Sequence, residues 1–189
     1  MGKLVVTEFI TLDGVVEDPG GSENHERGGW AFQFDRGPDG DKFKFDEVLA
    51  ADALLLGRTT YEGFAEAWPS REGEFADLFN GLPKYVVSST LTDPEWNNSH
   101  VIPGDDLAAE IGELKERYER DILLNGSAQL VQALTDLGLV DEYRLMVFPV
   151  VLGKGKRLFA DTAESKPLKL TSSTQAGETL IQIYEPAES

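Results

Sequence analysis

The sequence contains no cysteine, and its 17 lysine and arginine residues face 34 aspartates and glutamates, which gives a formal net charge of −17 at pH 7. The lack of cysteine excludes disulfides, zinc–thiolate sites and a cysteine nucleophile, and it fits a reducing compartment. A surface this negative repels nucleic-acid phosphates and anionic membranes. We therefore expect neither nucleic acid nor membrane among the partners of this protein.

Long hydrophobic runs are also missing. The longest nearly apolar stretch, Leu145 to Leu152, contains Pro149 and is far shorter than the roughly 20 residues that span a bilayer. Near the N-terminus, Thr7, Glu8 and Asp13 interrupt the apolar residues, and no small-residue cleavage site follows, so we expect no signal peptide. These features predict a cytoplasmic protein, and 189 residues fit one domain that spans 1–189.

Short apolar runs alternate with helical patterns through the first 140 residues. Strands are predicted at 3–11, 53–56, 84–87, 101–102 and 122–124. Helices are predicted at 41–51, from after 60 up to 68, and at 72–80. Two more helices are predicted to follow N-cap residues, one after Asp105 or Asp106 and one after Ser127. From Glu142 onward the pattern changes to strands at 143–152, 168–173 and 180–184, the last two forming a hairpin. This order predicts an α/β fold in which helices flank a mostly parallel central sheet with an antiparallel C-terminal hairpin.

Three of the predicted strands end abruptly in small or polar residues, namely Gly57-Arg58-Thr59-Thr60, Ser88-Ser89-Thr90 and Asn125-Gly126-Ser127. In open α/β sheets ligands bind beyond the carboxyl ends of strands, where helix N-termini favour phosphates. Each segment on its own is also typical of a turn or a cap. Their recurrence at consecutive strand ends favours a phosphorylated ligand that lies across several loops, with Arg58 suited to its charge. Neither a P-loop nor the three-glycine dinucleotide fingerprint is present.

These segments carry a family resemblance. Residues 54–62 resemble the strand-to-helix element of dihydrofolate reductases, 85–89 their second cofactor loop, and 123–127 their glycine-pair loop, with Ser127 in place of the second glycine. From Lys3 to Tyr184 the chain is more similar still to the C-terminal reductase domain of the bifunctional riboflavin-biosynthesis deaminase/reductase, above all to free-standing bacterial members of that superfamily. Segments 137–142 and 149–155 are typical of this group. The resemblance implies a three-layer dihydrofolate-reductase-like fold.

The resemblance also implies an activity, the transfer of a hydride from NADPH to a heterocyclic substrate. That substrate is either pterin-like or similar to 5-amino-6-(5-phosphoribosylamino)uracil, and the alternative is a nucleotide- or small-molecule-binding protein of the same fold without turnover. A homodimer is implied as well, with contacts from strand 143–152 or from the C-terminal hairpin. The resemblance, carried over residue by residue, implies three groups of cofactor contacts. The phosphates and ribose would contact Gly57, Arg58, Thr59 and Thr60, and the adenosine end would contact Ser88 and Ser89. The pyrophosphate and nicotinamide would contact Gly126, Ser127 and Ala128.

Two acidic residues are candidate catalytic groups. Asp13 matches the start of the loop that covers the substrate in these enzymes, and it either touches substrate or nicotinamide or caps a turn. Asp41 either corresponds to the substrate-binding acid of dihydrofolate reductases or caps its helix, and capping is favoured. A hydrolase that uses both carboxylates ranks last. No metal site is expected, because His25 and His100 are the only histidines and belong to no metal-binding motif.

Two further groups leave a choice open. The loop over 17–41 contains aromatic residues that cover either the core or a flat heterocycle, namely Trp30, Phe32 and Phe34. A cluster of basic residues either receives a substrate phosphate or forms a solvated turn, namely Lys154, Lys156 and Arg157.

Overall fold

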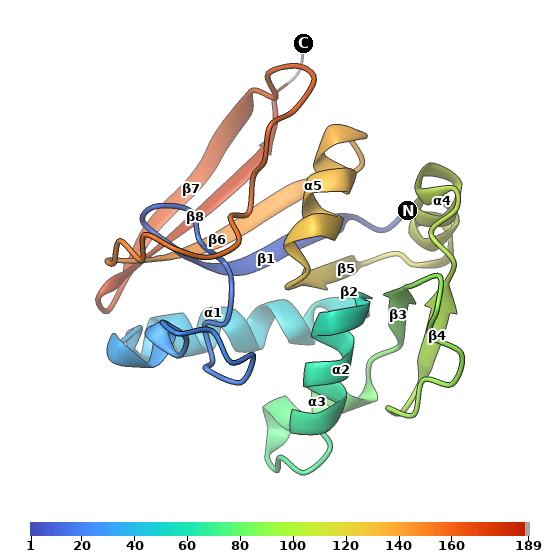
Figure 1. Cartoon of the computed structure of the whole chain (residues 1–189), viewed down its shortest axis with the longest axis horizontal. Coiled ribbons are helices and arrows are strands. Elements are labelled where there is room, and N and C mark those ends of the chain that lie inside the picture. The colour runs from blue at the N-terminus through green and yellow to red at the C-terminus, as the bar shows by residue number, and fades with distance from the viewer. Residues whose placement is uncertain (188–189) are drawn as a thin grey trace.

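A central sheet organises the computed structural model, which describes residues 1–187 (Figure 1). Within these residues eight strands lie in the order β4-β3-β2-β5-β1-β6-β8-β7. The strands are β1 (Leu4–Thr11), β2 (Ala51–Gly57), β3 (Lys84–Val87), β4 (Ser99–Ile102), β5 (Asp121–Asn125), β6 (Glu142–Phe148), β7 (Leu168–Ala176) and β8 (Thr179–Pro186). Neighbours from β4 to β6 are parallel, whereas β8 is antiparallel to both β6 and β7. The predicted parallel sheet with an antiparallel C-terminal hairpin is confirmed.

Helices cover both faces of the sheet and give three layers. They are α1 (Gly37–Leu49), α2 (Arg58–Ala67), α3 (Glu74–Gly81), α4 (Leu107–Arg117) and α5 (Ala128–Asp136), with a short 3-10 helix η1 (Trp30–Gln33). Figure 1 shows α1, α2 and α3 on one face and α4 and α5 on the other. Side chains of β1 alternate between these layers, because successive strand residues point to opposite faces. Val5 packs in the α1–α3 layer, whereas Leu4 and Val6 pack in the α4–α5 layer.

Several predicted boundaries were wrong. Helix α1 begins at Gly37, with Arg36 as its N-cap residue, so Asp41 lies inside the helix and is not its cap. Strand β6 ends at Phe148 and not at 152, because Pro149 has no N–H group to continue the ladder.

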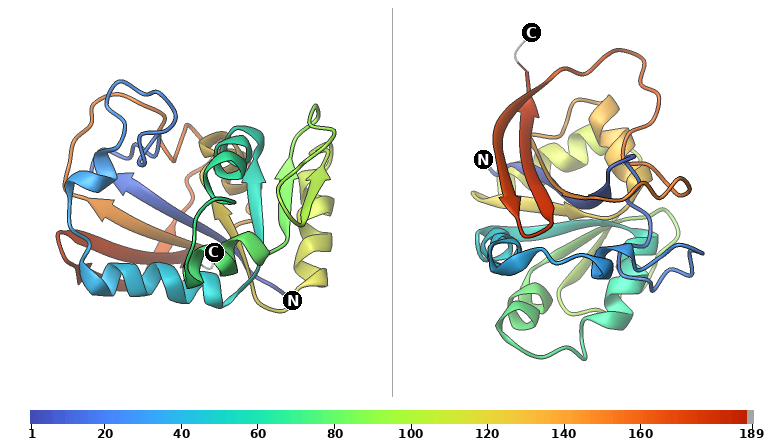
Figure 2. Two further views of the ribbon diagram at one scale, coloured as in Figure 1. Left: turned by 90° about the horizontal axis from the view of Figure 1, so that it is seen from below. Right: turned by 90° about the vertical axis from the view of Figure 1, so that its left-hand side faces the viewer.

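The aromatic residues of the long loop fill a third core beside the hairpin. Trp30 is fully buried, and its ring meets that of Phe148 edge-on with centroids 5.4 Å apart. Phe34 packs on the same ring at 6.2 Å, whereas Phe32 is exposed. Trp30 and Phe34 therefore cover the core. Figure 2 shows that the hairpin of this core and the pair β3–β4 lie at opposite ends of the sheet.

Among residues 1–187, no helix is long and apolar enough to cross a membrane.

Candidate functional site

Four neighbouring strands end at one edge of the sheet, which we call the carboxyl edge. Strands β3, β2, β5 and β1 lie side by side and parallel, so the loops that follow them meet there. The ends of these strands, with the loops and first helical turns that follow them, contain all the residues to which the sequence assigned the cofactor, and Asp13 as well. The fold thus brings together segments that are far apart in the chain, such as Gly57 and Ser127, which are 70 positions apart.

Hydroxyl groups connect the junction of β2 and α2 to the loop after β5. The backbone N–H of Gly57 donates to Oγ of Ser127 at 2.7 Å, and the Ser127 hydroxyl donates to Oγ1 of Thr60 at 3.0 Å. The packing is tight enough to require glycine at two positions. A Cβ atom at Gly57 would lie 2.4 Å from Ser127 Oγ, and one at Gly126 would lie 2.6 Å from Thr60 Oγ1.

Ser127 adopts a backbone conformation that favours glycine. Its φ is 60°, and Gly126 before it has a φ of 66°. A serine in this left-handed region costs about 1–2 kcal/mol. The side chain makes no cap hydrogen bond to α5, contrary to the predicted capping role, because Gly57 and Thr60 engage its hydroxyl. Helix α2 also begins without a side-chain cap, so both helices have first-turn N–H groups that side chains leave for an anion.

Arg58 supplies a positive charge at this edge. Its Nε donates to Glu62 at 2.8 Å, and its Nη1 donates to the hydroxyl of Thr90, so the side chain reaches from the start of α2 to the loop after β3. Ser88 Oγ orders the latter loop by accepting from the N–H groups of Thr90 at 3.2 Å and Leu91 at 3.1 Å. The guanidinium is half-exposed and can exchange these partners for a phosphate.

Asp13 holds two loops together. Its Oδ1 accepts from the Thr11 hydroxyl at 2.6 Å and from Leu152 N–H at 3.0 Å, and its Oδ2 accepts from Gly153 N–H at 2.8 Å. The Thr11 hydroxyl and the two N–H groups lower the pKa of Asp13 to about 2. The carboxylate therefore stays ionised and fastens the loop after β6 to the end of β1.

Asp41 lies on the solvent side of α1. Its side chain is 64% exposed, and its Oδ1 accepts from Arg36 Nε at 2.6 Å. The Asp41 carboxylate is therefore paired with Arg36 at the surface of α1.

Sequence reasoning missed Glu8, which lies in the middle of β1 and is only 6% exposed. Its Oε1 has no hydrogen-bond partner among the described residues. Burial raises the pKa of Glu8 to about 8, although Lys44 and the N–H of Gly126 act to lower it. The available signal was a carboxylate among the apolar residues of a central strand, where a charge is rarely placed without a partner.

Comparison with known proteins identifies the family. Residues 2–182 match the model of the RibD C-terminal domain. The chain belongs to this family. Two relatives from Bacillus subtilis (strain 168) are uncharacterized: YyaP is 31% identical over 186 residues, 96% of this chain and 93% of its own, and YwjB is 27% identical over 183 residues, 96% of each chain.

Solved structures agree on the fold. A protein from Shewanella sp. PV-4 provisionally assigned to riboflavin biosynthesis has a TM-score of 0.78 at 19% identity, covering 98% of this chain and 99% of its own. Dihydrofolate reductase from Enterococcus faecalis, solved with NADP(H), has a TM-score of 0.64 at 16% identity over 98% and 97% of the two chains. RibD from Acinetobacter baumannii has a TM-score of 0.70 at 17% identity over all of this chain and 59% of its own. The predicted dihydrofolate-reductase-like fold is confirmed.

A second buried acid of this RibD C-terminal domain, Glu47 on α1, contrasts with Glu8. Both of its carboxylate oxygens accept from the Thr7 hydroxyl at 2.9 Å, Lys44 forms an ion pair with it, and Arg144 Nη1 lies 3.9 Å away. All of its charge is balanced by side chains of the protein. Glu47 therefore has a structural role between α1 and the sheet.

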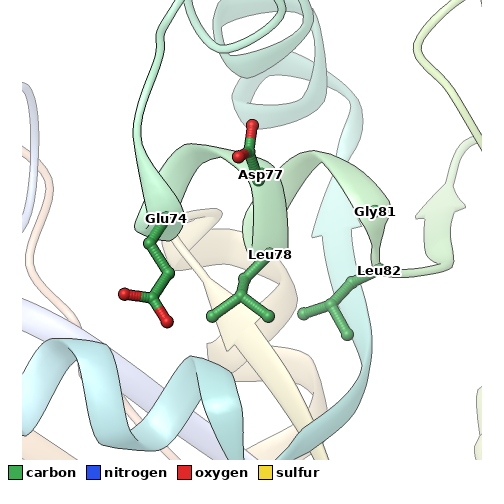
Figure 3. A pocket seen from close by; sticks show the side chains of 5 residues that line it. All are labelled: Glu74, Asp77, Leu78, Gly81 and Leu82. Atoms are coloured by element: carbon green, nitrogen blue, oxygen red, sulfur yellow. The ribbon is translucent and has the colours of Figure 1, made fainter.

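Two hollows of the domain lie away from the carboxyl edge. One, of about 540 Å³, lies along α3 and is lined by two carboxylates beside apolar side chains (Figure 3), namely Glu74, Asp77, Leu78, Gly81 and Leu82. The other, of about 210 Å³, lies near the end of α5 beside Phe159 and Lys166. Neither is lined by a residue of the four loops, and we assign no ligand to them.

Proposed function

We propose that this RibD C-terminal domain is an NADPH-dependent reductase that transfers a hydride to a heterocyclic substrate. The observation that carries the proposal is the meeting of the β2–α2 junction with the loops after β3 and β5 at the carboxyl edge, with two helix N-termini, close-packed glycines and Arg58. This donor set fits a dinucleotide phosphate. The family match and the reductase fold support the same activity.

The proposed cofactor contacts follow the loops. The phosphates and ribose lie against Gly57, Arg58, Thr59 and Thr60, the adenosine end against Ser88 and Ser89, and the pyrophosphate and nicotinamide against Gly126, Ser127 and Ala128. When bound, NADPH supplies the hydride. The protein orients the two reactants and excludes water. Asp13 acts here as a positioning residue that fixes the loop after β1, and solvent-facing Asp41 does not reach the reacting atoms.

The substrate is either pterin-like or a phosphoribosylaminopyrimidine. Lys154 pairs with Glu26, and Arg157 donates to the backbone of Asp13, so two of the three clustered cations are engaged. Lys156 is exposed and forms no ion pair within residues 1–187. A substrate phosphate would use Lys156, and Lys156→Ala would then raise KM for 5-amino-6-(5-phosphoribosylamino)uracil but not for dihydrofolate.

Thermal unfolding with and without NADPH tests cofactor binding. A nucleotide at 100 times its Kd adds about 2.7 kcal/mol to the free energy of unfolding. The variant Arg58→Ala should lose most of this gain. Lys42→Ala is the matched control, because Lys42 also forms an exposed i,i+4 ion pair, on α1. If millimolar NADPH produces no shift in wild type, the proposal is wrong.

Turnover separates the reductase from its alternative, a binding protein of the same fold. Steady NADPH oxidation with dihydrofolate, other pterins or aminopyrimidines identifies a reductase. NADPH binding without oxidation across this panel favours the binding protein, which the engaged state of Asp13 and Asp41 supports.

We further propose that residues 1–189 form one cytoplasmic domain, which the absence of cysteine supports, and that it dimerises. Strand β6 pairs on both sides within the sheet, so it offers no free edge. Strand β7 lies at the end of the sheet and is largely exposed, with Leu170 50% exposed. The hairpin is therefore the proposed contact, and Leu170→Glu should convert a dimer to a monomer in light scattering.

A further inference from the structure

Strands β1 and β5 separate at the carboxyl edge. Their last pair joins Thr7 to Asn125, after which the chain turns away at Gly126 while β1 continues beside β6. Glu8 is the first residue of β1 that has no neighbour on the β5 side. Its carboxyl group is buried there and interacts with the N–H of Gly126, a residue of the proposed nicotinamide contact. We call this place the β1–β5 gap.

Oε1 of Glu8 is a buried polar atom that lacks a hydrogen-bond partner within residues 1–187. Buried polar atoms are rarely left unpaired, and the exceptions call for a functional explanation. The carboxyl group of Glu8, when it carries a proton, suits a ligand that has a hydrogen-bond acceptor at this position.

The charge balance around Glu8 keeps its carboxyl neutral at pH 7. Burial is the largest influence and raises its pKa to about 8. Lys44 from α1 and the N–H of Gly126 act in the opposite direction, whereas Glu47 from α1 and Glu23 from the loop after β1 add to the effect of burial. A neutral carboxyl group still carries the proton that it can donate.

We propose that Glu8 is the proton donor of the reduction. The carboxyl O–H bond breaks and its proton forms an N–H or O–H bond on the C=N or C=O group of the substrate, whose carbon receives the hydride of NADPH. The substrate is reduced and NADPH is oxidised to NADP⁺. Glu8 is left as a carboxylate beside the cationic nicotinamide and regains a proton from solvent. This role rests on the proposed function.

The affinity of the two nucleotides as a function of pH tests this role without any substrate. Oxidised nicotinamide is cationic and reduced nicotinamide is neutral. Ionisation of Glu8 should therefore strengthen the binding of NADP⁺ and not that of NADPH. Between pH 7 and pH 9 we expect Kd for NADP⁺ to fall by about tenfold relative to Kd for NADPH. The 2′-phosphate is common to both nucleotides and cancels in this ratio.

Variants show whether Glu8 causes the pH dependence of the Kd ratio. In Glu8→Gln the ratio of the two Kd values should be independent of pH, and in Glu8→Asp the dependence should return in part. Glu142→Gln is the matched control, because Glu142 is similarly buried on the neighbouring strand but lies at the amino end of β6 and pairs with Arg144. It should keep the wild-type dependence.

Carbon-13 NMR of labelled glutamate gives a direct reading in the wild-type protein, so the test does not depend on how the variants fold. One carboxyl resonance should titrate near pH 8 and should move to lower pH when NADP⁺ binds. Where a substrate is turned over, Glu8→Gln should lower kcat by 10²–10⁴-fold. Binding of both nucleotides with a ratio that does not change with pH, or a Glu8 resonance that titrates near pH 4.5, overturns this role alone. Absence of binding by either nucleotide overturns the proposed function with it.

Discussion

Two buried carboxyl groups on opposite sides of β1 differ in how many hydrogen-bond and ion-pair partners they have. Glu47 lies in what we call the α1 cluster, with Thr7, Lys44 and Arg144, where hydroxyl and cationic groups surround both oxygens. Glu8 lies in the β1–β5 gap with one oxygen unpartnered. The difference teaches that burial alone does not identify a functional acid. A buried acid with a full set of partners stabilises the fold, and one without them is available to a ligand.

The largest expected effect follows from removing the charge of Glu47. Glu47→Gln leaves Lys44 and Arg144 without this partner in a buried site, which destabilises by about 3–5 kcal/mol. Glu8→Gln at pH 6 removes no charge from the folded chain but removes an ionised carboxylate from the unfolded chain, so it should raise the free energy of unfolding by about 2 kcal/mol. Urea denaturation at pH 6 measures both. Equal losses in the two variants would mean that the comparison is wrong.

The pH dependence of stability should separate the two acids further. The pKa of Glu8 is about 8 in the folded chain and near 4.5 in the unfolded chain, so between these values the folded chain binds more protons. Its contribution is therefore fully present below pH 4.5 and is lost as pH rises towards 8. From pH 6 to pH 7.5, wild type should lose about 2 kcal/mol relative to Glu8→Gln.

Paired urea titrations of wild type and Glu8→Gln at these two pH values check this difference, since the other 33 acidic residues are common to both proteins. A constant difference across the range would show that Glu8 ionises normally.

The fold could be predicted from the sequence because its signals are local. Apolar runs such as 122–124 mark strands that are buried on both faces, and the small residues after them mark the carboxyl edge. Helix starts were harder to predict, and α1 begins four residues before Asp41 because Pro38 occupies its first turn.

The state of each acid could not be predicted from the sequence. Asp13 and Asp41 stand beside glycines and turns, where functional residues are common, yet their partners Leu152, Gly153 and Arg36 are set by tertiary contacts. The hydrogen-bonding state of Glu8 depends on the residue at which β5 separates from β1, and the order of strands in the sheet sets that residue. A sequence pattern does not show which carboxyl oxygen has a hydrogen-bond partner.

Ser127 offers a smaller test at the carboxyl edge. Ser127→Ala removes the acceptor of Gly57 N–H but keeps the strained backbone, and should destabilise by about 1–2 kcal/mol. Ser127→Gly loses the same hydroxyl and relieves the strain, so it should be about 1 kcal/mol more stable than Ser127→Ala. Thermal denaturation of the two variants measures the difference. If the alanine variant is the more stable one, the left-handed conformation carries no strain at this position.

Asp13 gives the smallest expected effect and extends the comparison to a carboxylate near the surface. Its pKa is lowered to about 2, so its contribution is present above the usual pKa of 3.8 and is lost as pH falls towards 2. Because the side chain is partly exposed, we expect Asp13→Asn to cost only about 1 kcal/mol at pH 7. The cost should shrink between pH 4 and pH 2, in acid denaturation followed by circular dichroism. If Glu8 is the proton donor, kcat should fall as pH rises above about 8, because Glu8 then ionises.

Since Asp13 fastens a loop and donates no proton, Asp13→Asn should raise KM and keep this fall of kcat at alkaline pH. If the fall is lost in Asp13→Asn and kept in Glu8→Gln, the proton donor is Asp13 and not Glu8.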